Sequence, residues 1–292
     1  MTVTEQPRKT ELIDRLAEEA SRKYPDQAES VARFVREYFA LVAPDDLNVD
    51  PQTLLGGALS LWEFGAQRKP EESKVRLFNP TMAEHGWNLS HTVMEIVNDD
   101  MPFLVDSIIG EMNVAERNIH LIIHPVLTVR RDAEGNRETL LGRYESGGKT
   151  SAVHESHMHF EIDQETEPAD LEKLKNDIET ILSDVRLAVA DWLPMRARLF
   201  QSLEEIDHSN PPIPGDEVEE SKEFLRWLAD DHFVFLGYRQ YQFVSDESNE
   251  FLKIVPGSGL GLLREVRPES RSRGEVPFSP EFSRFARRKE LI

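Results

Sequence analysis

The residues best suited to binding a small molecule lie in the segment 98–106. This segment stands between an alternating stretch typical of a strand and apolar residues at helical spacing. A turn of this kind presents backbone N–H groups at a helix N-terminus, where a carboxylate binds, and its aspartates attract an ammonium. It therefore predicts a site for a zwitterionic amino-acid effector. The candidate effector-binding residues are Asn98, Asp99, Asp100, Met101, Pro102, Phe103 and Asp106.

The same segment also has a purely structural interpretation. Asp99 or Asp100 is a typical helix N-cap, and Pro102 suits the first helical turn, which needs no N–H donor there. The carboxylates would then be a cap and solvated charge. The two interpretations differ in whether a ligand binds.

Histidines and glutamates on two expected strands form a second group. These residues are His120, His124, His157, His159, Glu155 and Glu161. A metal site needs three or more converging ligands, whereas side chains on one sheet face point in parallel. The favoured role is a polar outer face or a subunit contact, with a metal as the alternative. We predict no metal-binding residue.

Motifs for catalysis and cofactor binding are incomplete in this chain. Gly257, Gly259 and Gly261 resemble a dinucleotide fingerprint, but Leu262 stands where the third glycine belongs, which favours a glycine loop. The GxSxG and HExxH patterns are absent, and Ser107 has no histidine nearby in the sequence. We therefore predict no catalytic residue and no cofactor in this chain.

The composition narrows the range of partners and compartments. The net charge is −20, from 54 acidic and 34 basic residues, which disfavours nucleic acid and anionic membranes as partners. The one basic cluster, Arg284, Arg287, Arg288 and Lys289, is too small for a nucleic-acid site. The chain has no cysteine, no signal-peptide pattern and no apolar stretch of membrane length, which predicts a cytoplasmic protein.

The first part of the chain is predicted to be helical. Apolar residues at helical spacing predict helices over 11–23 and 29–43, and Asp50-Pro51 reads as a cap followed by a first-turn proline. A polar stretch near residues 66–75 marks a boundary. Residues 1–70 are therefore expected to form a helical N-terminal segment.

The central part predicts most of a ferredoxin-like βαββαβ module of the α+β class. Strands are expected over 89–99, 119–131 and 154–163, with one helix after the first strand and another from about Pro168. The expected sheet is antiparallel with helices on one face, and the module spans 75–209. Pro194 is expected to kink or end the second helix. The predicted core residues are Val93, Phe103, Leu104, Ile108, Phe160, Ile178 and Val185.

The last part, residues 216–292, predicts the start of a second unit. NPPIPGDE over 210–217 is a linker by composition. A helix over 219–229, a strand over 233–244 and a partner strand over 251–256 follow. The chain then stops without closing a recognisable unit, which predicts a cut end.

A family resemblance rests on the phrases NDDMPFLVDSIIGEM, HPVLTVRRDAEGN, ESHMHFEID, DDHFVFLGYRQYQF and GLGLLRE, in order across about residues 87–264. These phrases resemble the N-terminal region of the large bacterial NAD-specific glutamate dehydrogenases. The resemblance implies a much longer parent chain, in which ACT-type modules precede a domain that deaminates L-glutamate to 2-oxoglutarate with NAD. It also implies ligand binding at the turn after the first strand. No catalytic or nicotinamide-binding position of the family has a match here.

Two hypotheses follow from the residues and the resemblance together. The chain is either a regulatory, amino-acid-sensing part of such a dehydrogenase, or a structural module whose sheets pair between subunits of a homo-oligomer. Specific ligand binding would separate them, because a ligand that binds only the folded state raises its melting temperature.

Overall fold

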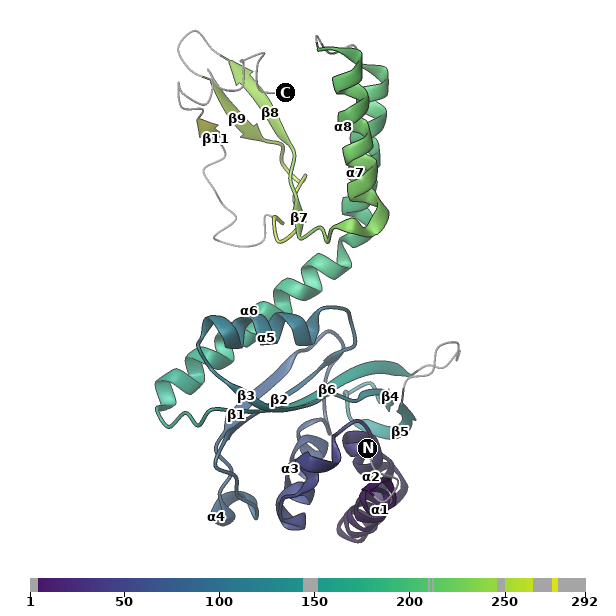
Figure 1. Cartoon of the computed structure of the whole chain (residues 1–292), viewed down its shortest axis with the longest axis vertical. Helices are drawn as coiled ribbons and strands as arrows, with labels where there is room; N and C mark the ends of the chain where they lie inside the picture. Colours follow the sequence, from purple (N-terminus) through teal and green to yellow (C-terminus); the bar gives the residue numbers. More distant parts are fainter. Residues whose placement is uncertain are drawn as a thin grey trace. The chain divides into compact units, whose positions relative to one another are not determined.

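The structure is a computed structural model that describes residues 5–143, 152–209, 211, 213–245, 250–264 and 275–277 (Figure 1). The chain forms two compact units, Met1–Ser183 and Asp184–Ile292, and the boundary falls inside helix α6 (Pro168–Ala190). The basic cluster Arg284–Lys289 lies outside the described residues.

The first unit begins with three helices, α1 (Glu5–Lys23), α2 (Ala28–Phe39) and α3 (Pro51–Phe64). The predicted start of α3 is confirmed, since the Asp50 carboxylate accepts a hydrogen bond from the Gln52 N–H at 3.2 Å. Short 3₁₀ turns over Pro25–Gln27 and Pro44–Leu47 join the helices.

A six-stranded antiparallel sheet forms the centre of the first unit. Its strands are β1 (Lys74–Phe78), β2 (Thr92–Asp99), β3 (Ile119–Ile123), β4 (Val126–Arg131), β5 (Arg137–Arg143) and β6 (Val153–Ile162). They lie in the order β1-β2-β6-β4-β5, and β3 also pairs with β6. Helix α5 (Leu104–Val114) follows β2, α6 follows β6, and the short α4 (Met82–His85) precedes β2. This is the expected α+β architecture of an ACT-type module with helices before it.

Three features of the sheet differ from the sequence prediction. The expected strand 119–131 is two strands, because the chain turns at Pro125, whose carbonyl accepts from the His157 N–H at 3.1 Å. Strand β5 was not expected after the turn at 132–136. Strand β1, also unexpected, pairs antiparallel with β2. It lies at the sheet edge that the last strand of a βαββαβ unit would take.

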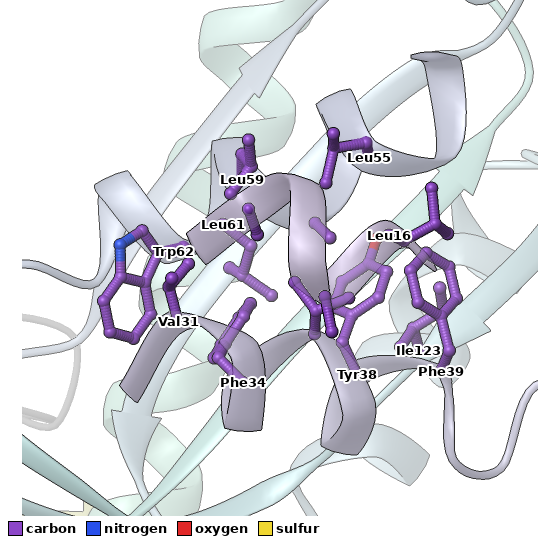
Figure 2. Packing of buried hydrophobic residues seen from close by; sticks show 14 of the residues in the cluster. Leu16, Val31, Phe34, Tyr38, Phe39, Leu55, Leu59, Leu61, Trp62 and Ile123 are labelled. Carbon is purple, nitrogen blue, oxygen red and sulfur yellow. The ribbon is translucent and has the colours of Figure 1, made fainter. Parts of the chain in front are cut away.

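The two helices of the predicted module lie on one face of the sheet as expected, and the N-terminal helices cover the other face (Figure 1). Helices α1–α3 lie on one side of the sheet, and α5 with residues 168–183 of α6 lie on the other (Figure 1). Tyr38, Phe34 and Phe39 of α2 pack with Leu55, Leu61 and Trp62 of α3 in the core cluster that reaches Ile123 of β3 (Figure 2). Because helices cover both faces of the sheet, the side chains on both faces are buried, including charged ones such as Glu155.

Most of the predicted core is confirmed. The buried residues are Val93, Leu104, Ile108, Phe160, Ile178 and Val185. Phe103 is the exception, with 45% of its surface exposed. It occupies the N-cap of α5 in a left-handed conformation (φ 70°), and this turn directs the ring away from the core.

The second unit contains helices and short strands. After α6 come α7 (Trp192–His208), α8 (Gly215–Trp227) and a π-helical turn (Leu228–His232). The strands are β7 (Gly237–Tyr238), β8 (Tyr241–Ser245), β9 (Glu250–Ile254), β10 (Leu260–Gly261) and β11 (Glu275–Pro277). The helix is interrupted at Asp191, between α6 and α7 and shortly before Pro194, so the predicted interruption is confirmed.

The expected hairpin of the second unit is confirmed by the pairing of β8 with β9, although its first strand is shorter than the predicted 233–244. The glycine loop is also present. Gly261 has φ 58°, and a Cβ there would lie 2.3 Å from the Leu236 carbonyl oxygen, so the close pairing of β10 with β7 requires glycine. Leu262 lies in a turn rather than a helix, which excludes the dinucleotide interpretation at this position.

Candidate functional site

The turn between β2 and α5 contains the predicted effector-binding residues. Strand β2 ends at Asp99 and α5 begins at Leu104, so Pro102 precedes the helix instead of lying in its first turn. Phe103 takes the N-cap position without a side-chain hydrogen bond. The expectation that Asp99 or Asp100 caps the helix is therefore wrong. The Asp99 carboxylate is turned toward Arg68 and the Asp100 carboxylate toward Ser156 of β6.

The polar side chains at the start of the turn already have partners inside the unit. The Asn98 Oδ1 accepts from Ser73 Oγ at 2.7 Å, and Asp99 Oδ1 accepts from Arg68 Nη2 at 2.7 Å. Asp100 Oδ1 accepts from Ser156 Oγ at 2.7 Å. These bonds fix the shape of the turn on its sheet side.

The other end of the turn faces solvent. Pro102, Phe103 and Asp106 are exposed and Met101 is half-buried. Asp106 lies in the first turn of α5, the part of a helix whose N–H groups have no partner within the helix. A ligand at this turn would meet that carboxylate and those N–H groups.

A buried ionic network lies on the face of the sheet that α1–α3 cover. Its centre is Glu155 on β6, whose side chain is 0% exposed. Glu155 Oε1 accepts from Arg68 Nη2 at 2.8 Å and from Arg131 Nε at 2.6 Å, and its Oε2 accepts from Arg131 Nη2 at 2.8 Å. The His157 Nε2 lies 3.1 Å from the same Oε2. One carboxylate thus binds two arginines and an imidazole.

A loop after α3 and the last residue of strand β4 supply the two arginines. Arg68 follows α3, and Arg131 ends β4 just before a tight turn. The Asp132 carboxylate stabilises that turn by accepting from the N–H groups of Glu134 (3.0 Å) and Asn136 (2.7 Å). Arg131 also donates to the carbonyls of Gly65 and Gly135, at 2.9 and 2.8 Å, so it connects the α3 loop, the turn and the sheet.

The pKa values of Glu155 and His157 are both shifted by burial and by the neighbouring charges. Burial opposes ionisation of Glu155, but the hydrogen bonds from Arg131 and His157 and the charge of Arg68 outweigh it and hold the pKa of Glu155 well below its ordinary value. Burial also lowers the pKa of His157, with Glu155 opposing the shift. Glu155 is therefore a carboxylate and His157 a neutral imidazole at neutral pH.

Arg137 stands at the border of the network. Its guanidinium lies 3.1 Å from the centroid of the Trp62 ring and donates to the Trp62 carbonyl at 3.0 Å. Burial and the neighbouring Arg131 lower its pKa to about 9, against the attraction of Glu155. The stacked indole compensates part of the lost hydration.

The four predicted histidines do not share one surface. His157 and His159 are buried, and their rings contact Phe34 and Tyr38 of α2 edge-on at 5.8 Å, so the prediction of a polar outer face is wrong for them. His120 instead stacks on His91, with ring centroids 4.0 Å apart. Within the described residues, no group of three or more His, Asp or Glu side chains is placed to hold a metal ion.

The residues of the buried network that the sequence interpretation missed are arginines. Arg68, Arg131 and Arg137 are distributed over 70 positions and carry no motif. One signal was available. The alternation of β6 puts Glu155, His157, His159 and Glu161 on one face of the sheet. Because the N-terminal helices need a surface to pack on, this face of a ten-residue strand can be covered by them. Buried carboxylates then require basic partners.

Comparison with known proteins gives a family match within the first unit. Residues 34–178 match the family model for the glutamate dehydrogenase ACT1 domain. The NAD-specific glutamate dehydrogenase of Halomonas elongata is 36% identical over 99% of this chain, and that of Pseudomonas aeruginosa is 34% identical over 81%. The corresponding protein of Mycobacterium tuberculosis is 25% identical over 59%. The aligned segments span 18%, 15% and 10% of these relatives, so the chain corresponds to less than a fifth of their length.

Among the helices of the described residues, none combines the length and apolar character needed to cross a membrane.

Proposed function

Because the chain belongs to the NAD-specific glutamate dehydrogenase family, we propose that it is a regulatory ACT-type region of an enzyme that oxidises L-glutamate to 2-oxoglutarate and ammonium with NAD. In this proposal the chain senses an amino acid and performs no catalysis itself. A cytoplasmic location and assembly into a homo-oligomer are further parts of the proposal.

The observation that carries the sensing role is the exposed start of α5 in a module of this family. The β2–α5 turn places the exposed Asp106 beside the first N–H groups of a helix. A ligand carboxylate at those N–H groups gains hydrogen bonds and about 0.3–1 kcal/mol from the helix dipole at an exposed site. The ligand ammonium would then bind the Asp106 carboxylate and the Asp100 Oδ2, the oxygen that does not accept from Ser156.

A purely structural role is the second candidate, and a different observation favours it. Asp99 and Asp100 already bind Arg68 and Ser156 in the folded unit, so part of the predicted ligand-binding charge is committed to the fold. Under this hypothesis the turn only connects β2 to α5, and the module contributes to assembly of the parent enzyme.

Calorimetric titration of the 292-residue chain with a panel of amino acids and with 2-oxoglutarate tests the sensing role. An amino acid should bind, and 2-oxoglutarate should bind less well because it lacks the ammonium. Asp106→Asn and Asp100→Ala should weaken amino-acid binding, whereas the matched change Asp26→Asn, at an exposed site in the first 3₁₀ turn, should not. Absence of binding at millimolar amino acid, or unchanged binding by both turn variants, would leave the structural role in its place.

The absence of catalysis in this chain has its own test. The purified chain should produce no NADH from L-glutamate and NAD above a buffer blank. Activity that follows this chain through purification would contradict the proposal.

A further inference from the structure

A cavity of about 190 Å³ lies under the N-terminal helices of the first unit, separate from the β2–α5 turn. It is bordered by α2, the 3₁₀ turn Pro44–Leu47, α3 and the strands β3 and β6. Its size exceeds the ~150 Å³ of an apolar cavity known to bind benzene. The cavity therefore has room for a compact organic molecule.

The two ends of the cavity differ in chemistry. Most of the wall is apolar and includes Phe39, Val42, Leu54, Trp87, Leu121 and Ile123. The other end consists of His91, His120, His159 and Glu161. There His91 Nδ1 lies 3.1 Å from Glu161 Oε2, which leaves Glu161 Oε1 to face other groups. A ligand that fits needs an apolar body and one polar group.

His159 is a buried polar side chain that borders the cavity. It is 2% exposed, and its Nδ1 has no hydrogen-bond partner among the described residues. The nearest carboxylate oxygens, Glu95 Oε1 and Glu161 Oε1, lie 3.9 and 3.8 Å from its ring nitrogens, beyond hydrogen-bond distance. The Glu95 Oε1 is likewise buried without such a partner. His159 Nδ1 and Glu95 Oε1 face each other across 3.9 Å, so the polar wall behind the cavity is not closed by a hydrogen bond between them.

The carboxylates that line the cavity favour a ligand with a positive charge. Glu161 lines its polar end, and Asp45 and Asp46 lie at its exposed side. Among the described residues that line it there is neither lysine nor arginine. Burial opposes ionisation of Glu161, but the neighbouring His159 and His91 outweigh burial and hold the pKa of Glu161 below its ordinary value. Burial and the charges of Glu95 and Glu161 raise the pKa of Tyr38, whose hydroxyl in the wall stays protonated.

We infer that this cavity binds a small primary amine with an apolar body, whose ammonium donates to Glu161 Oε1. An ammonium has three donors and no acceptor, which matches the carboxylate oxygen Glu161 Oε1 at the polar end. An α-amino acid fits less well, because its carboxylate would lie near Glu161 without a cationic partner. The site is thus distinct in place and in ligand chemistry from the proposed amino-acid site.

Benzylammonium is a suitable probe, because its ring fills a cavity of this size and its amine is charged at neutral pH. Titration of the unaltered 292-residue chain should show binding of benzylammonium at least about tenfold tighter than of benzyl alcohol, a difference expected for a charge-assisted hydrogen bond. Phenylacetate, with the opposite charge, should bind weakest. Ring resonances of His91, His120 and His159 should shift on binding, and those of His208 and His232 in the second unit should not.

A charge-removing variant locates the ammonium. Glu161→Gln keeps the shape of the side chain and should weaken benzylammonium binding about tenfold or more, while benzyl alcohol binding stays unchanged. The matched control Glu138→Gln, at an exposed position of β5, should leave both unchanged. Absence of benzylammonium binding at millimolar concentration, equal binding of phenylacetate, or unaltered binding by a folded Glu161→Gln chain would overturn the inference. The probe ranking needs no variant, so it remains decisive if Glu161→Gln does not fold.

Discussion

One face of the central sheet presents Met94, Ile96, Met158 and Phe160 to α5 and α6, whereas the opposite face presents acidic residues and histidines to α1–α3. Both faces are interior, since all four apolar residues, Glu155, His157 and Glu95 are 0% exposed. The apolar face is stabilised by removal of hydrocarbon from water, which depends on area and not on direction. The polar face depends on each carboxylate and imidazole having a partner.

Alternation of polar and apolar residues along a strand therefore shows which side chains share a face, but it does not show that the polar face is exposed to solvent. The network around Glu155 costs desolvation of its charges, but it restricts the arrangement of the covering segments because Arg68 and Arg131 must both reach Glu155. We interpret the network as the feature that fixes how the N-terminal helices sit on the sheet.

The largest effect is expected from removing the centre of the polar face. Glu155→Ala leaves two guanidinium groups buried without their carboxylate, and the loss of one partner from such a network costs about 5 kcal/mol at the upper end of the usual range. Urea titration of the free energy of unfolding measures this. Glu138→Ala, an exposed glutamate on β5, is the control and should change stability by less than about 0.5 kcal/mol. A similar small loss for Glu155→Ala would mean that the network is solvated.

The apolar face should respond to volume instead of charge. Phe160→Ala should cost roughly 3–5 kcal/mol, because it removes a fully buried ring from between β6 and the covering helices. Phe160→Leu, which keeps most of the volume, should cost less than about 1.5 kcal/mol. If the alanine variant loses less than about 1 kcal/mol in the same titration, the face assignment is wrong.

Acid should weaken the polar face in two stages. The folded-state pKa of His157 lies below its unfolded value of about 6.5, so its contribution is complete above that pH and falls as the pH drops, by at most about 1.4 kcal/mol per pH unit for one proton. The pKa of Glu155 is also lowered, so its contribution is complete above about pH 4.3 and is lost as the pH falls through the folded value. Unfolding measured between pH 7 and pH 4 should show declining stability. Constant stability over that range would contradict the burial of His157.

The smallest effect is expected at Phe103, which belongs to neither face. The residue has φ 70°, a conformation that glycine adopts without strain, and its ring is half in solvent. In Phe103→Gly the relieved strain and the lost contacts should nearly cancel, with a net change within about 1 kcal/mol. A loss above about 2 kcal/mol, like that expected for Phe160→Ala, would show that the ring packs in the core.

The parts of the fold that the sequence predicts are those with local signals. The cap at Asp50, the interruption before Pro194, the β8–β9 hairpin and the apolar faces around Phe160 each follow from spacing or from a single residue type. These features depend on neighbours within a few positions, which periodicity reports directly.

The features that the sequence does not predict depend on distant contacts. Strand β1 has five residues among charged neighbours, and it becomes a strand because β2 offers it an edge. Glu155 and Arg68 are 87 positions apart, so their pairing leaves no local pattern. The left-handed Phe103 follows from closure of the β2–α5 turn, since an aromatic residue disfavours that conformation by itself.

The most direct test of the buried polar face is an NMR titration of the His157 imidazole in the 292-residue chain. His157 is expected to take up its proton at a pH below the ordinary value, because burial lowers its pKa more than Glu155 raises it. Substitution of His157 identifies its resonance. Protonation near the ordinary value of about 6.5 would show that this face is open to water and would contradict the account.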